Sequence, residues 1–121
     1  MAATQAALVD GVFLAVADVP TAIYTAPASS SPTNGKGALI TAFTIANGSS
    51  SSINYKAWVV PNGSSVGDEF LLVPQRTIKT LKTDVPYDAI GHLMPASSIL
   101  YIEYDTANSA GIRVSGVELS L

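Results

Sequence analysis

Two neighbouring stretches decide the fold, and they read ALITAFTIA at residues 38–46 and INYKAWVV at residues 53–60. Both are rich in β-branched and aromatic residues, which favour extended strands. Within them side chains alternate with a period of two, so successive residues face opposite sides of a sheet. Between them, Asn47 and Gly48 accept the positive φ angles that tight turns require. The two stretches therefore predict two β-strands joined by a turn.

The rest of the chain repeats this pattern of short apolar segments separated by Gly, Pro, Asn and Ser. Further strands are predicted at residues 6–16, 21–26, 69–73, 76–82, 98–104 and 110–121. Pro74 is expected to end one strand before an exposed, cation-bearing edge strand begins, and a change of parity at Gly116 predicts a one-residue bulge. No sustained helical periodicity is present. The pattern predicts an all-β protein, a two-sheet β-sandwich of eight to nine short strands with jelly-roll or immunoglobulin-like topology.

The length of 121 residues fits one domain, residues 1–121, with a core large enough to fold without disulfides or metals. The sequence contains no Cys, which excludes thiol catalysis and thiolate metal sites. Apolar residues that share a face in the strongest strands are expected to form the core. They are Leu39, Phe43, Ile45, Tyr55, Val59, Leu72, Ile99, Tyr101, Ile112 and Val114.

The surface is expected to carry few charges, because charged residues make up 12% of the chain and hydrophobic residues 48%. Such a chain is poorly protected against association, so we expect it to bury surface in a partner or a homo-oligomer. A neutral secreted β domain is the alternative. The net charge of −3 argues against nucleic acid as a partner. The longest apolar run, residues 12–17, is too short to span a membrane, and the N-terminal segment lacks the basic start of a secretory signal.

Candidate catalytic residues are few. The single histidine, His92, has no recognisable nucleophile motif elsewhere in the chain, and we interpret it as a structural or surface residue. Asp84 and Asp88 lie four residues apart in a turn-rich segment, where they would hold a cation or act as an acid and base pair. Asp side chains more often stabilise turns of this kind. We therefore expect no catalytic residue, no metal, no cofactor and no enzymatic activity.

Aromatic side chains outside the expected core suggest contact surfaces instead, because Tyr and Trp are enriched at protein interfaces. An exposed Trp58 would also be able to stack on a sugar ring, whereas a core or subunit-interface position is the alternative for this residue. The candidate interface residues are Trp58, Tyr24, Tyr87, Tyr104, Ala6 and Leu8. The last two belong to a small, apolar segment, residues 1–10, that is either an extended N-terminal arm or a frayed end followed by an ordinary edge strand.

Four motifs, in their order along the chain, resemble those of a known class of proteins. They are AIYTAP at residues 22–27, LITAFTIAN at 39–47, YKAWVVP at 55–61 and IRVSGVE at 112–118. Together they span about four-fifths of the chain, and it resembles small β-sandwich structural proteins of tailed bacteriophages. Proteins of that class are virion components, found as capsid decoration (cement) proteins or as parts of the tail and baseplate.

The resemblance implies a structural protein without catalytic residues. The expected function is that of a capsid decoration protein that bridges and stabilises capsid subunits, with the major capsid protein or other virion proteins as partners. A homotrimer is expected, since three-fold positions are common on capsid shells, and the location is the virion, assembled in the host cytoplasm. The alternative is a tail, baseplate or fibre component that recognises a host glycan or receptor through its Ser- and Asn-rich loops.

Overall fold

The computed structural model describes residues 2–28 and 35–120, and within them nearly all regular structure is β-strand. Two single-turn 3-10 helices complete it, and no described helix has the length and hydropathy needed to cross a membrane. In chain order the elements are β1 (Ala2–Val12), β2 (Thr21–Thr25), β3 (Gly35–Asn47), β4 (Ile53–Val60), η1 (Asp68–Phe70), β5 (Leu71–Ile78), β6 (Thr83–Asp84), η2 (Tyr87–Ala89), β7 (Leu93–Met94), β8 (Ile99–Tyr104) and β9 (Ala110–Ser120).

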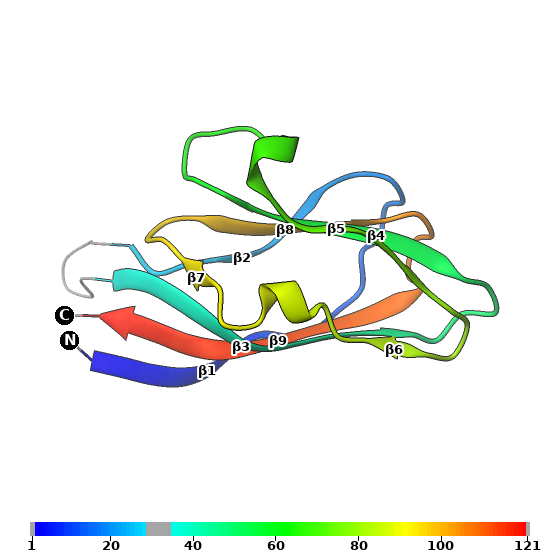
Figure 1. Cartoon of the computed structure of the whole chain (residues 1–121), viewed down its shortest axis with the longest axis horizontal. Coiled ribbons are helices and arrows are strands. Elements are labelled where there is room, and N and C mark those ends of the chain that lie inside the picture. Colours follow the sequence, from blue (N-terminus) through cyan, green and yellow to red (C-terminus); the bar gives the residue numbers. More distant parts are fainter. Residues whose placement is uncertain (1, 29–34, 121) are drawn as a thin grey trace.

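The strands form two antiparallel sheets packed face to face (Figure 1). Sheet A has the order β1-β9-β3-β6, with β7 also paired to β3, and sheet B has the order β2-β8-β4-β5. The prediction of a two-sheet β-sandwich is confirmed.

The pairing is nested, which identifies the topology. The first strand pairs with the last, β2 with β8, β3 with the short strands β6 and β7, and β4 with β5. A long hairpin folded over itself in this way, with partners alternating between two sheets, is a jelly roll. Of the two topologies expected from the sequence, the structure has the jelly roll and lacks the immunoglobulin arrangement.

The core lies between the sheets and is made by the inward side chains of β3, β4, β8 and β9. Five residues of the expected core are buried, namely Phe43, Ile45, Tyr55, Ile112 and Val114. The other five are only half-buried, namely Leu39, Val59, Leu72, Ile99 and Tyr101. Of these, Val59 and Leu72 still pack against the core. Buried residues that were not expected there include Leu14, Ile40, Leu100, Ile102 and Tyr104.

A bulge explains why Leu39 was wrongly placed in the core. Ile40 faces Gly116 of β9 and Ala42 faces Ser115, so Thr41 has no partner in that strand. The extra residue reverses the parity of β3, and Ile40 on one side of it is buried like Phe43 on the other. Leu39 therefore points away from the core, whereas uninterrupted alternation would have kept it on the side of Phe43.

The bulge predicted at Gly116 itself is wrong in its location. The irregularities beside this residue lie in the neighbouring strands, at Leu8 of β1 and at Thr41 of β3. A Cβ atom on Gly116 would lie 2.2 Å from the carbonyl oxygen of Leu39. Glycine is required here because the adjacent strand approaches too closely for any side chain.

On β8 the expected inward face was also wrong. The side chains of Leu100, Ile102 and Tyr104 face the core, and Ile99 and Tyr101 face outward. Both faces of this strand are apolar, so alternation alone does not distinguish them.

Pro74 does not end a strand, since β5 continues through it to Ile78. Because β5 is the edge of sheet B, the missing N–H of Pro74 removes no bond from the interior of the sheet. The expected edge strand at residues 76–82 is instead the end of β5 followed by a turn. In that turn the N–H of Lys82 donates to the carbonyl of Lys79.

Candidate functional site: an apolar groove at the sheet edge

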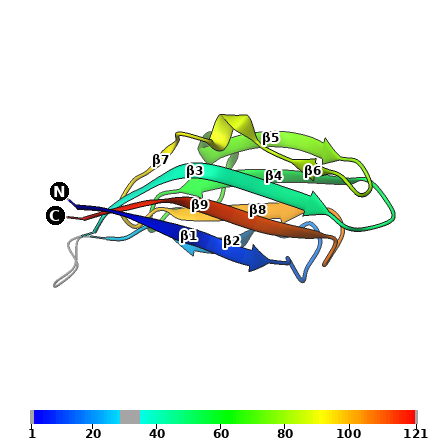
Figure 2. The same ribbon diagram turned by 90° about the horizontal axis from the view of Figure 1, so that it is seen from below.

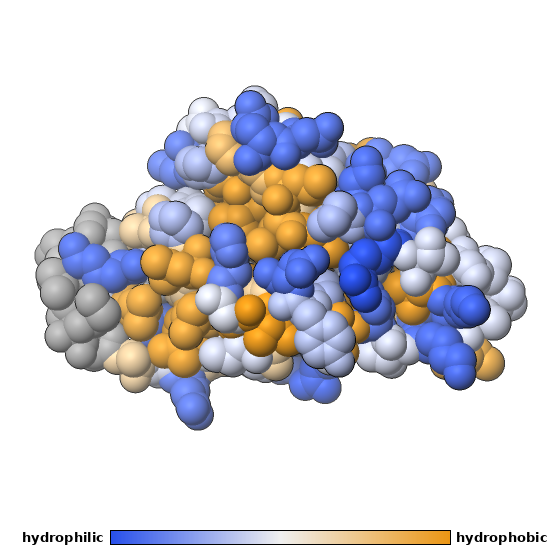
Figure 3. Space-filling model, in the orientation of Figure 1, coloured by the Kyte–Doolittle hydropathy of each residue, from blue (hydrophilic) through white to orange (hydrophobic). Residues whose placement is uncertain are grey.

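A mainly apolar hollow lies on one side of the sandwich, where β4 and β5 of sheet B face the chain around β7. It is an open groove of about 270 Å³. We call it the edge groove, and its lining residues are Val59, Pro61, Glu69, Phe70, Leu71, Leu72, His92, Leu93, Pro95 and Ser98. The space-filling view shows apolar side chains gathered in the middle of this side of the molecule (Figure 3).

Three separate segments build the edge groove. Val59 is the penultimate residue of β4, the chain then leaves the sheet at Pro61, and it returns through η1, whose last residue is Phe70, into β5. The opposite wall is held by backbone bonds to β3. The N–H of Ile40 donates to the carbonyl of His92 over 3.1 Å, and the N–H of Gly91 donates to the carbonyl of Ile40 over 2.7 Å.

This wall also exposes apolar surface next to the groove. Leu93 is 51% exposed, and Tyr87 and Ile90, which precede it in the chain, are 75% and 37% exposed. Grouped apolar residues of this kind mark a protein-binding site more often than scattered ones do. The edge groove and this flank therefore make one candidate contact surface.

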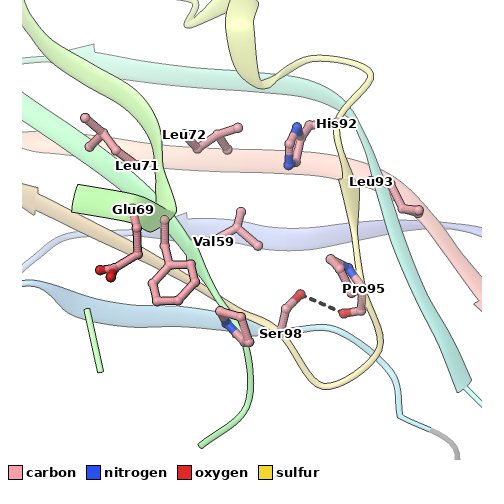
Figure 4. A pocket seen from close by; sticks show the side chains of 10 residues that line it. Val59, Glu69, Leu71, Leu72, His92, Leu93, Pro95 and Ser98 are labelled. Carbon is pink, nitrogen blue, oxygen red and sulfur yellow. Dashed lines mark hydrogen bonds between the residues drawn. The ribbon is translucent and has the colours of Figure 1, made fainter. Parts of the chain in front are cut away.

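Ser98, His92 and Glu69 all line the groove, but they do not form a catalytic set. Figure 4 shows His92 and Glu69 on opposite sides of the groove. The hydroxyl of Ser98 is buried and donates to the carbonyl of Pro95 over 2.7 Å, which closes a local turn. No hydrogen bond joins these three side chains to one another. A nucleophile activated by a base needs such contact.

Asp84 and Asp88, the sequence candidates for a cation or acid and base pair, have different environments. Asp88 is exposed in η2. Asp84 receives two bonds from the guanidinium of Arg76, Nε to Oδ2 at 2.7 Å and Nη2 to Oδ1 at 2.9 Å. The hydroxyl of Tyr55 donates to Oδ2 over 2.6 Å. Over residues 2–28 and 35–120, no three His, Cys, Asp or Glu side chains group closely enough to hold a metal ion.

These contacts shift two pKa values in opposite directions. Hydrogen bonding from Arg76 lowers the pKa of Asp84 below its usual range, and the bond from Tyr55 acts in the same sense. Burial raises the pKa of Tyr55, and its bond to the Asp84 carboxylate raises it further. The carboxylate thus stays charged and the phenol neutral near pH 7, and the cluster joins β4, β5 and β6 across the sandwich edge.

Two of the aromatic interface candidates are buried within the chain instead. Tyr104 is 1% exposed, and its hydroxyl accepts a bond of 2.7 Å from the N–H of Leu14. Trp58 is 4% exposed and lies opposite Tyr101 on the outer face of sheet B. There η1 contacts β4 and lies over that face (Figure 1). The indole Nε1 of Trp58 has no hydrogen-bond partner.

The other interface candidates differ in their exposure. Tyr87 is strongly exposed beside the edge groove. Tyr24 is half-buried, and its hydroxyl donates over 2.6 Å to Oε2 of Glu118 in the opposite sheet. Burial and this bond raise the pKa of Tyr24. Ala6 and Leu8 are half-buried in β1, and residues 2–10 of the suggested arm lie within that strand, paired to β9.

Sequence reasoning missed most of the groove. Phe70, Leu71 and Leu93 are not among the candidates. Phe70 and Leu71 lie in the short apolar strand predicted at residues 69–73, Leu93 lies in an irregular segment, and nothing in their spacing indicates that they meet. The apolar residues on either side of Pro95 and Pro61 were the available signal. No protein-family model, no curated protein and no solved structure matches the chain. Its function is therefore inferred from its own geometry.

Proposed function

We propose that the protein is a structural component of a tailed-phage particle, a capsid decoration protein that bridges capsid subunits through the edge groove. The observation that carries the proposal is an apolar groove, flanked by the exposed side chains of Leu93 and Tyr87, on the side of the jelly roll. The resemblance of residues 22–118 to phage β-sandwich proteins is the reason for proposing a phage particle as the place where the protein acts. Jelly rolls are also common among capsid proteins, which supports the proposal by analogy of fold.

The groove suits this function because bridging requires contact and no chemistry. An apolar side chain of a capsid subunit would replace water over Val59, Phe70 and Leu72, which is favourable in proportion to the area covered. Each contact can be weak, since many copies act together on one shell. Contacts made only in the assembled shell stabilise that state by linkage. On the particle we expect the copies to be arranged as homotrimers.

The test compares particles assembled with and without this chain. Heating releases the DNA of a filled head, and we expect release at a lower temperature when the chain is absent. Antibody labelling in the same particles places the protein on the head or the tail. Equal release temperatures together with labelling at the tail would replace the proposal by the alternative of a tail, baseplate or fibre component.

A further inference from the structure

The four sheet edges of the sandwich are unequally protected against pairing with another chain. At one side, β5 contains Pro74, and β6 and β7 have two residues each. At the other side, β2 has five residues, whereas β1 has eleven. Figure 2 shows β1 at the border of sheet A, and no strand of the described residues lies beyond it. Proteins usually protect such an edge with Lys, Pro or a short strand, and β1 contains neither residue.

The first half of β1 has a regular register and no charged residue. Its register with β9 is regular from Ala2 to Ala7, and the first shift comes at Leu8. The one charged residue of the strand, Asp10, lies beyond that shift and pairs with Arg113 at 3.0 Å. Residues 3–7 therefore present an edge without charge or bulge.

The faces of this segment are fixed by its neighbours. Gln5 lies opposite Val117, and both line a shallow hollow on the outer side of sheet A. Thr4 lies opposite Glu118, whose carboxylate reaches across the interior to Tyr24 in sheet B. Odd-numbered side chains of the segment thus face outward and even-numbered ones inward.

We propose that β1 pairs antiparallel with β1 of a second copy of this chain, around a two-fold axis at Gln5. Opposite residues in an antiparallel pair share a face, so the inner faces of both copies stay aligned only when odd residues meet odd ones. Centring on Gln5 satisfies this condition. It places Gln5 opposite Gln5, Ala3 opposite Ala7 and Thr4 opposite Ala6.

A second copy fits this edge because the register is self-complementary. No like charges meet in the paired window, and its small side chains leave room on both faces. The contact joins two A sheets into one continuous sheet and closes on itself, giving a dimer. A homotrimer on a particle would use other surfaces, so the dimer does not depend on the proposed phage function.

Cysteine cross-linking of the full chain tests the pairing, because the sequence has no native Cys. Paired residues have Cβ atoms about 5 Å apart, close to the distance that a disulfide spans. We expect Gln5→Cys to form a covalent dimer on mild oxidation. Ala3→Cys and Ala7→Cys should each give little dimer alone and a cross-linked heterodimer when mixed. Ser115→Cys, exposed on the interior strand β9, is the matched control and should stay monomeric.

Light scattering of the native chain and of two lysine variants provides a second, independent test of the proposed pairing. Light scattering should show a concentration-dependent dimer for the native chain, and Gln5→Lys, which places two ammonium groups opposite each other, should shift it to monomer by at least tenfold in dissociation constant. Ser115→Lys should leave it unchanged. A native chain that is monomeric at all concentrations, or cross-linking of Ser115→Cys as fast as Gln5→Cys, would overturn the proposal.

Discussion

The bulge at Thr41 predicts that alanine substitution destabilises the protein much more at Ile40 than at the adjacent residue Leu39. Ile40 is 0% exposed in the core, whereas Leu39 is half-buried on the outer face, opposite Val117 of β9 and Leu93 of β7. Replacing each by alanine in turn removes the same number of carbon atoms. The two losses of unfolding free energy therefore report directly which of the two side chains faces the core, with the number of removed carbon atoms held constant.

The expected magnitudes follow from the burial. Ile40→Ala loses about 2.4 kcal/mol of transfer free energy, at roughly 0.8 kcal/mol per buried carbon group. It also leaves a cavity, which brings the loss of unfolding free energy to about 3–4 kcal/mol. Leu39→Ala removes surface that is already partly in water and leaves no closed cavity, so we expect a loss of about 1 kcal/mol.

Urea unfolding at pH 7 measures both costs, at one low protein concentration so that association does not contribute. The slopes of unfolding free energy against urea should match among native chain and variants, which permits the comparison of midpoints. A cost for Leu39→Ala equal to or greater than that for Ile40→Ala would refute the bulge. That result would mean that side chains alternate without interruption along β3, as expected from the sequence alone.

Three further substitutions test other features of the structure. Tyr104→Phe leaves the buried N–H of Leu14 without an acceptor and should cost about 1–3 kcal/mol of unfolding free energy, measured by urea titration. Gly116→Ala places a methyl group against the carbonyl of Leu39 and should lower stability by about 1–3 kcal/mol, whereas an unchanged melting temperature would show that the strands are farther apart. Asp84→Asn tests the pH dependence. Because the pKa of Asp84 is lower in the folded than in the unfolded state, its charged form stabilises the fold above about pH 4, and this contribution is lost as pH falls through the folded value. The stability difference between native chain and variant should thus be constant from pH 5 to 7 and shrink in more acidic urea titrations; a constant difference down to pH 2 would contradict it.

The strands were predictable where the chain alternates over a half-buried sheet. The stretches at residues 38–46 and 53–60 gave the right elements, and Phe43, Ile45 and Tyr55 are core residues as expected. Alternation carries this information because one face of each strand meets the opposite sheet and the other does not.

Bulges and the groove were not predictable, because they depend on partners far away in the chain. The bulge at Thr41 is defined by which residues of β9 it fails to face, and β3 alone does not contain that information. The edge groove joins Val59, Phe70 and Leu93, which come from three segments brought together by the jelly-roll topology. Its residues show no common spacing in the sequence.

The central claim is that the edge groove binds the particle, and co-sedimentation tests it most directly. Particles assembled without the chain are mixed with purified native protein, with Leu93→Glu on the flank of the groove, or with Ala22→Glu as a control on the exposed outer face of sheet B, in the edge strand β2. Leu93 is 51% exposed, so its substitution should leave the fold intact, as circular dichroism would verify. The native protein and Ala22→Glu should bind heads alike, and Leu93→Glu should bind at least tenfold more weakly, because a carboxylate would be buried against an apolar partner. Equal binding of native protein and Leu93→Glu, or no binding of native protein to heads, would contradict the claim.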